Sequence, residues 1–183
     1  MRKKTRVFEQ HLYHDIEDDT AADEYLEKSL PLVGEVVMCF NGLEKFLDSI
    51  LCEEFTDRTD QMGLIVLKGM LYSAKVDLFA RFEDGFVAAT GKAPSKYGGL
   101  IKELRELGAL RNQVVHADWE NTDEEGYTYV RLRFSERGMV QEYVQFSEES
   151  LSKLIERIVA ARSWLDDYWI ERNDQLYGRE GNT

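Results

Sequence analysis

The segment LVGEVVMCFNGLEKFLDSILCEEF, residues 32–55, carries apolar side chains three or four positions apart. They belong to Val33, Val36, Val37, Phe40, Leu43, Leu47 and Leu51. This spacing is typical of an α-helix that buries one face. The helical signal begins at Thr20, an N-cap residue, and Asp23 and Glu24 follow in the first turns. Pro31 either kinks this helix or starts a second one, so residues 20–55 are helical in both cases.

The same period predicts three further long helices and one break in the helical pattern. The helices span about residues 61–89, 96–119 and 147–176. After the third helix the pattern changes to strict alternation around SERG, residues 135–138, which predicts a β-hairpin over about 127–146. The sequence therefore predicts a mainly α fold, an antiparallel multi-helix bundle with a β-hairpin inserted before the last helix.

The length and composition suit a single domain with a real core. The chain has 183 residues, of which 43% are hydrophobic and 32% charged. We expect a flexible polar segment over residues 1–19, one helical domain over 20–177 and a short tail over 178–183.

Several features predict a cytoplasmic protein. No apolar run reaches the ~18 residues that a membrane span needs, and no apolar stretch follows the basic start MRKKTR. Cys39 and Cys52 lie in one predicted helix, roughly 20 Å apart, so we expect two reduced thiols rather than a disulfide.

The net charge of −12 argues against a broad basic face for duplex DNA. A small, focused cationic site remains compatible with this charge. We find no spacing typical of a metal site, so we expect no metal and no cofactor. His11 and His14 are three residues apart beside Asp15, and we interpret them as part of a solvated tail rather than as metal ligands.

Three charged residues lie within apolar helix faces, namely Glu44, Lys75 and Arg111. A buried charge costs several kcal/mol unless it is paired. We therefore expect an internal or cleft-lining network in which Glu44 pairs with Arg111 or Lys75. Two simpler explanations are an ion pair that only fixes helix register, and long Lys and Arg arms that reach solvent.

The segment RNQVVH, residues 111–116, has the clearest chemical signature. Asn112 and His116 are four apart and share a helix face, which Arg105 extends, and the long arm of Arg111 can reach the same place. Arg stabilises a phosphate whose charge grows in a transition state, and His transfers protons near neutral pH. Such a set suits metal-free cleavage of RNA by its own 2′-hydroxyl.

The longer segment LRNQVVHADW, residues 110–119, resembles the signature of HEPN domains, the higher-eukaryote-and-prokaryote nucleotide-binding family. The family motif is an Arg, a polar residue that is often Asn, three more residues and a His. It matches Arg111, Asn112 and His116. The resemblance covers about residues 30–175 and includes long antiparallel helices with the motif late in one of them. It identifies the predicted bundle as HEPN-like and the hairpin as a subfamily insertion.

The resemblance implies a homodimer in which two motif helices share one metal-free ribonuclease cleft. It also implies a toxin or phage-defence effector with an antitoxin or regulatory protein, in which Glu44 and Lys75 would support Arg111. Toxins silenced by an AMP-transferring antitoxin usually carry Tyr two residues after the His, where this chain has Asp118. This departure argues against that kind of pairing, and Asp118 would instead orient His116 or pair with Arg111.

Two aromatic groups outside the motif have more than one interpretation. Tyr127, Tyr129, Arg131 and Arg133 alternate along the predicted hairpin, so we expect them to share one face. That face is either a single-stranded RNA contact, to which Arg105 would add, or an ordinary exposed strand face. Trp164, Tyr168 and Trp169 suit a core or a dimer interface.

The sequence thus predicts a metal-independent endoribonuclease that acts on RNA. His116 would be the general acid or base, Arg111 would stabilise the transition state and Asn112 would orient them. The alternative is a non-catalytic HEPN-like module that binds nucleotide, RNA or a protein partner. A third possibility is a purely structural helical domain in which Arg111 only fixes helix register.

Overall fold

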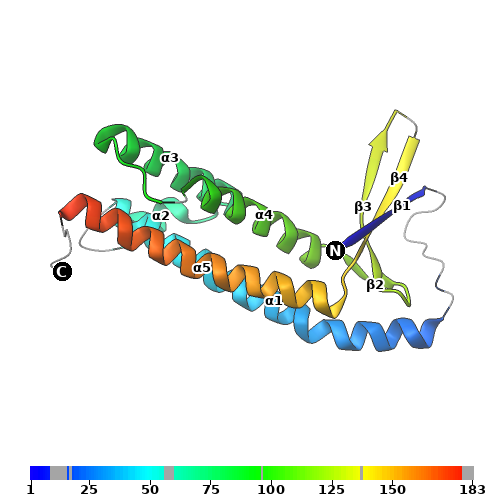
Figure 1. Ribbon diagram of the computed structural model, residues 1–183. Helices are drawn as coiled ribbons and strands as arrows, with labels where there is room; N and C mark the ends of the chain where they lie inside the picture. The colour runs from blue at the N-terminus through cyan, green and yellow to red at the C-terminus, as the bar shows by residue number, and fades with distance from the viewer. Residues whose placement is uncertain (9–15, 17, 56–59, 96, 137, 179–183) are drawn as a thin grey trace. The chain divides into compact units, whose positions relative to one another are not determined.

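A computed structural model of the chain describes residues 1–8, 16, 18–55, 60–95, 97–136 and 138–178. Its elements, in chain order, are β1 (Arg2–Val7), α1 (Asp19–Phe55), α2 (Gln61–Leu67), α3 (Tyr72–Thr90), α4 (Tyr97–Val115), β2 (Asp118–Thr122), β3 (Tyr127–Ser135), β4 (Gly138–Gln145) and α5 (Glu148–Tyr177). Most described residues are helical, which confirms the mainly α class (Figure 1).

The described residues form two compact units. The first contains residues 1–38 and 110–156, and the second contains residues 39–109 and 157–183. Helices α1, α4 and α5 each begin in one unit and end in the other, because the unit boundaries fall within them.

The first unit contains an antiparallel sheet in the order β1-β4-β3-β2 (Figure 1). Strands β3 and β4 form the predicted hairpin, and Ser135 pairs with Gly138 at the turn. Gly138 has φ +109°, a conformation that side-chain-bearing residues rarely adopt. The predicted hairpin is confirmed.

The other two strands were not predicted. Arg2–Val7 forms the edge strand β1, in a segment we expected to be flexible, and pairs with β4. Its side chains are mostly exposed, so no apolar alternation marks it in the sequence. Asp118–Thr122 forms β2, where we expected the third helix to continue to Trp119, and the hydroxyl of Thr122 lies 3.0 Å from that of Thr128 in the interior.

The core of the first unit lies where β3 and β4 meet helical residues of the same unit. The hydroxyl of Tyr25 on α1 donates to the carbonyl of Phe146 at 2.6 Å. Gly126 has φ +80° and lies so close to the Tyr25 ring that a Cβ there would clash. The fully or almost fully buried apolar side chains are Val36, Val114, Tyr143, Val144, Phe146, Leu151 and Leu154.

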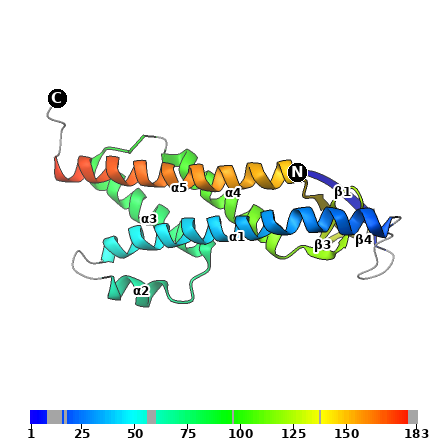
Figure 2. The same cartoon turned by 90° about the horizontal axis from the view of Figure 1, so that it is seen from below.

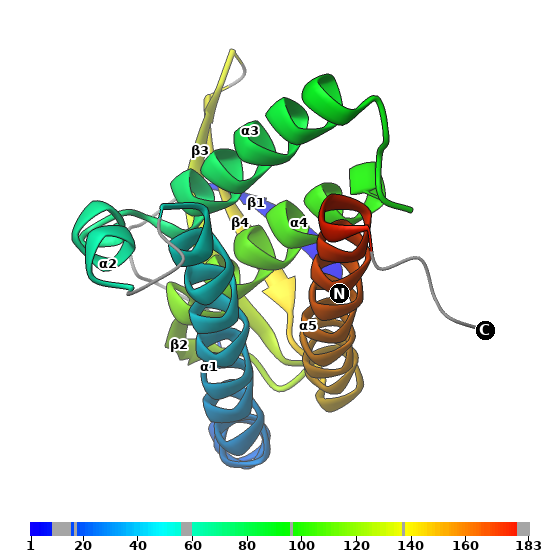
Figure 3. The same ribbon diagram turned by 90° about the vertical axis from the view of Figure 1, so that its left-hand side faces the viewer.

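In the second unit, the predicted helix over 61–89 is two helices. Gly69 has φ +80°, which ends α2, and α3 begins three residues later (Figures 2 and 3). Leu64 and Leu71 lie at the spacing that would bury them on one face of a single helix over 61–89, yet they are 57% and 75% exposed. The buried side chains of α3 are Lys75, Val76, Phe79, Glu83 and Phe86.

The last helix follows the sequence closely. The first begins at Asp19, and Asp18 rather than Thr20 caps it, because its carboxylate accepts a hydrogen bond from the Ala21 amide at 3.0 Å. Helix α1 continues through Pro31, so this proline does not start a second helix. The hydroxyl of Ser147 accepts a hydrogen bond from the Ser150 amide at 3.2 Å, as expected of a residue that caps α5. Apolar side chains at helical spacing along α5 are buried, namely those of Leu151, Leu154, Ile158, Leu165 and Trp169. Within the described ranges, no helix has an apolar stretch long enough to span a membrane.

Candidate functional site

The candidate site is the end of α4 in the first unit. Helix α4 ends at Val115, and the amide of His116 still donates to the carbonyl of Asn112 at 3.0 Å. His116 and Asn112 are exposed, whereas Arg111 is half-buried. The guanidinium Nη1 of Arg111 donates to Oδ1 of Asn112 at 3.1 Å. The motif thus places an imidazole at the solvent-exposed helix end, one turn after an Arg–Asn contact.

Trp119 fixes the path of the chain immediately after His116. Its indole Nε1 donates to the carbonyl of Val114 at 2.8 Å, which satisfies one of the carbonyls that the end of a helix leaves unpaired. Its ring packs on that of Phe146, with centroids 5.2 Å apart. Sequence reasoning missed this role, although a Trp three residues after the motif His was a visible signal.

Asp118 begins β2 and faces the hairpin. Its carboxylate accepts a hydrogen bond from the side-chain amide of Asn121, and its backbone pairs with Tyr129. Burial, and then the nearby charge of Asp118, raise the pKa of Tyr129 above its ordinary value. The carboxylate of Asp118 therefore contacts Asn121 of its own strand. Its predicted effect on His116 or Arg111 stays a prediction.

Glu44 and Lys75 form the predicted ion pair in the second unit. The Lys75 ammonium lies 2.8 Å from Glu44 and 2.8 Å from Asp48, a second partner that sequence reasoning missed. Burial disfavours the ammonium, but hydrogen bonds to Asp48 and Glu44 outweigh this effect and raise the pKa of Lys75. Arg111 belongs to the first unit, so its support by Glu44 and Lys75 stays a prediction.

Arg105 lies earlier on α4, in the second unit. Its guanidinium contacts the carboxylate of Asp77 at 2.8 Å, and both side chains are more than half exposed. An exposed pair of this kind contributes little to stability. Its predicted RNA contact is not tested by this geometry.

The sequence predicts that the tyrosines and arginines of the hairpin share one face, and this prediction is wrong. A β-bulge shifts the register of β3, so that Tyr129 pairs with Tyr143 but Arg131 pairs with Glu142. Because Glu142 and Tyr143 are consecutive on β4, their side chains point to opposite faces, and their partners do the same. Tyr127 therefore lies on the same face as Tyr129, and Arg133 lies on the same face as Arg131.

Strand β1 adds cations to both faces of this sheet through its own register with β4. We call one face the tyrosine face, formed by Arg2, Lys4, Arg6, Tyr127, Tyr129, Phe134 and Tyr143. We call the other the arginine face, formed by Lys3, Arg131, Arg133 and Glu142.

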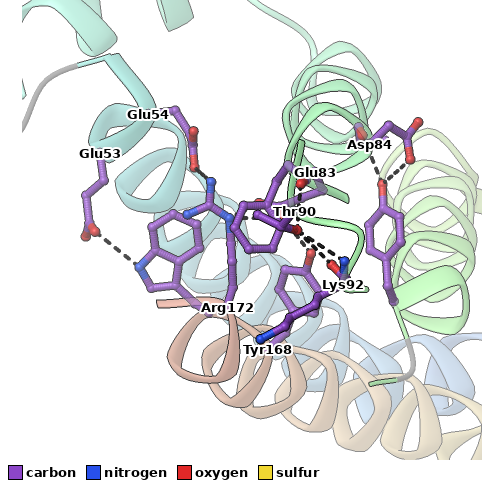
Figure 4. A network of polar contacts seen from close by, with 12 residues as sticks. Glu53, Glu54, Glu83, Asp84, Thr90, Lys92, Tyr168 and Arg172 are labelled. Atoms are coloured by element: carbon purple, nitrogen blue, oxygen red, sulfur yellow. Dashed lines mark hydrogen bonds and ion pairs between the residues drawn. The ribbon is translucent and has the colours of Figure 1, made fainter. Parts of the chain in front are cut away.

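A buried polar network in the second unit also escaped prediction (Figure 4). The Nε of Arg172 lies 3.0 Å from Glu83, and its Nη2 contacts Glu54. The hydroxyl of Tyr168 donates to Glu83 at 2.6 Å. The guanidinium also packs 4.6 Å from the Trp169 ring centroid. This network joins α1, α3 and α5 within the unit. Tyr168 and Trp169 are buried in the core, one of the two interpretations of these aromatic residues, whereas Trp164 is half-buried.

The described residues contain no group of three or more His, Cys, Asp or Glu side chains that could hold a metal ion. His11 and His14 lie outside the described residues, so the structure does not place them.

Comparisons with protein-family models, with curated proteins and with solved structures found no match to this chain. The HEPN resemblance therefore rests on the motif and on the order of helices.

Proposed function

We propose that this protein is a metal-independent endoribonuclease with its catalytic residues at the end of α4. The observation that carries the proposal is the exposed imidazole of His116, one turn beyond the contact between Arg111 and Asn112. An exposed imidazole is accessible to a large substrate such as RNA. The half-buried guanidinium of Arg111, one turn earlier on α4, supplies a positive charge held by Asn112.

The proposed chemistry needs only these three side chains. His116 takes the proton of a 2′-hydroxyl, whose oxygen then attacks the adjacent phosphorus. Arg111 stabilises the extra negative charge on the phosphoryl oxygens in the transition state. Asn112 holds Arg111 through the 3.1 Å hydrogen bond. His116, now protonated, gives this proton to the 5′-oxygen of the next nucleotide as that oxygen leaves, and the products carry 2′,3′-cyclic phosphate and 5′-hydroxyl ends.

The resemblance to HEPN ribonucleases supports two further parts of the proposal. Two copies of the chain would place their α4 ends across one cleft, and each copy would contribute an Arg and a His. The biological role would be that of a toxin or phage-defence effector, held inactive by a partner protein.

Cleavage of mixed RNA by the purified protein in EDTA tests the proposal. We expect the unsubstituted chain to cut, and His116→Ala to cut at least about 100-fold more slowly, because general acid–base catalysis contributes about 10²–10⁴-fold. The matched control is His14→Ala, which removes a histidine of the N-terminal segment and should leave cleavage unchanged.

A second candidate function is a non-catalytic HEPN-like module that binds nucleotide, RNA or a protein. The net charge of −12 favours the form of it that binds a protein, because this charge repels a polyanionic substrate overall. Folded, dimeric protein that does not cut RNA in the test above would contradict catalysis and support this second function.

A further inference from the structure

The sheet of the first unit is a basic region in an acidic chain. Strands β1, β3 and β4 carry six Lys and Arg side chains and one carboxylate, that of Glu142. The chain as a whole has a net charge of −12. Such segregation of charge on three adjacent strands indicates a surface that meets an anion.

The two faces of the sheet differ in the groups that accompany these cations. On the arginine face, the ammonium of Lys3 and the guanidinium groups of Arg131 and Arg133 lie 3.6, 2.9 and 3.7 Å from Glu142. Burial works against ionisation of this carboxyl, but these cations hold the pKa of Glu142 below its ordinary value. The cations of this face thus gather around one buried carboxylate.

On the tyrosine face, cations alternate with aromatic rings. The ammonium of Lys4 lies 4.1 Å from the Tyr127 ring centroid, and the Arg6 guanidinium lies 5.9 Å from that of Tyr143. Arg2 and Arg6 are exposed, Tyr127 and Tyr129 are half-buried, and Tyr143 is buried beneath them. Phe134 is 77% exposed at the far end of the hairpin.

Two carboxylates also belong to this surface. Asp123 is buried and forms an ion pair with Lys4, so the ammonium of Lys4 already has a partner within the protein. Asp118 lies opposite Tyr129. The exposed charges of the tyrosine face are therefore those of Arg2 and Arg6 on β1, beside the rings of β3.

We propose that the tyrosine face binds single-stranded RNA and delivers it to the end of α4. Unpaired bases stack on Phe134 and Tyr129, and phosphates contact Arg2 and Arg6. Stacking surfaces with cations along the backbone path are how proteins hold single strands without reading sequence. The bases of a duplex are already stacked on each other, so the rings favour a single strand.

The path from this face to the motif is short along the chain. Strand β2 begins at Asp118, two residues after His116, and pairs with β3 in the same sheet. Neighbouring strands are about 4.8 Å apart, so β1 lies roughly 14 Å from β2 across the sheet. A strand of RNA that crosses the sheet from β1 toward β2 therefore approaches the segment that holds His116.

This inference rests on the proposed function for the identity of its ligand, and its test measures binding without cleavage. The protein is the full chain with His116→Ala, and the probe is a labelled single-stranded oligouridylate of about 12 nucleotides. Fluorescence anisotropy gives the Kd at about 0.1 M salt. The first variant is Arg2→Gln with Arg6→Gln, and the second is Phe134→Ala.

The matched control is Lys3→Gln with Arg133→Gln. It also removes two positive charges from the sheet, but from the arginine face, and it keeps the 2.9 Å contact of Arg131 with Glu142. We expect the Arg2 and Arg6 pair to raise the Kd about tenfold or more, and Phe134→Ala to raise it about tenfold. The control should raise the Kd less than about threefold.

Three outcomes would overturn the inference. An equal loss of affinity in the Arg2 and Arg6 variant and in the Lys3 and Arg133 control would mean that overall charge attracts the RNA. Unchanged affinity in both tyrosine-face variants would mean that the RNA binds at another site. Equally tight binding of duplex RNA would exclude stacking of bases on the rings. Phe134 is exposed, so its truncation tests the face even if substitutions in β1 loosen the sheet.

The two proposals fail separately. Cleavage that persists without tyrosine-face binding contradicts only the inference, and such binding without cleavage contradicts only the catalytic function.

Discussion

Trp119 is the side chain that fixes how the backbone turns from α4 into β2. Its indole N–H is bonded to the Val114 carbonyl, and its ring packs on Phe146. His116 lies between these two anchored points, at residues 114 and 119. In the proposed mechanism, Trp119 is thus a positioning residue that acts through the backbone around His116.

Replacement of Trp119 by Phe tests this role. The smaller ring still packs on Phe146 but loses the hydrogen bond, so we expect the free energy of unfolding to fall by about 1 kcal/mol. Urea denaturation measures the loss. In the proposed enzyme, kcat should fall more than KM changes, because His116 would be held less well. An unchanged denaturation midpoint would show that this bond contributes nothing.

At the residue scale, the sequence predicted a charged pair correctly on the helix whose buried face it also predicted correctly. Glu44 lies on a helix whose period is uninterrupted, so its position within an apolar face correctly indicated a partner, Lys75. Glu83 escaped prediction because the phase assigned to its helix came from Leu64, Leu67 and Leu71. Gly69 ends that helix, and α3 begins with a new phase that buries Glu83.

At the scale of elements, the buried carboxylate of Glu83 belongs to a network that joins three helices of the second unit. Glu54 on α1 and Glu83 on α3 share the guanidinium of Arg172 on α5. Burial raises the pKa of both carboxyls, and Arg172 partly opposes this effect. A carboxyl whose pKa is raised on folding contributes most stability below its ordinary pKa of 4.5, and loses that contribution as pH rises through its folded pKa.

Substitution Arg172→Met tests how charge and packing divide this role. Without the guanidinium, both carboxyls resist ionisation more strongly. We expect a loss of about 3–5 kcal/mol in the free energy of unfolding at pH 7.5, and a smaller loss at pH 5. Denaturation at the two pH values measures the difference. Arg172→Met combined with Glu83→Gln should recover part of the loss at pH 7.5, and equal losses at both pH values would assign the effect to packing.

The sheet shows which elements a sequence pattern does not mark. The hairpin was predictable, because β3 and β4 alternate and SERG provides the turn. Strand β1 was not, because an edge strand with exposed side chains needs only backbone pairing. The bulge between Tyr129 and Arg131 inserts one residue into β3, and no feature of the alternation shows where it falls.

At the scale of the whole molecule, three strands of one sheet carry six Lys and Arg side chains and one carboxylate, while acidic residues outnumber basic ones in the rest of the sequence. Such a distribution lets an acidic protein bind a polyanion locally, and it predicts strong salt dependence of that binding. The mainly α class followed from periodicity, whereas the HEPN-like arrangement of helices stays a prediction.

The proposed composite site predicts an oligomer. Sedimentation equilibrium should give twice the chain mass of 21.3 kDa, and specific activity should fall when the protein is diluted below its dimer dissociation constant. A monomer that cuts RNA with undiminished specific activity would contradict the shared cleft and leave each α4 end as a site by itself.

The pairing of β1 with β4 has a consequence for synthesis. Arg2 pairs with Gln145, so the partner of the first strand leaves the ribosome long after the strand itself. At ~5–20 residues per second, that interval is on the order of 10 s. Throughout it, the most basic strand is an unpaired cationic peptide among ribosomal RNA, which is itself a polyanion. The nascent chain therefore presents this cationic strand to RNA before it has a complete sheet or the α4 end to which the proposed function assigns cleavage.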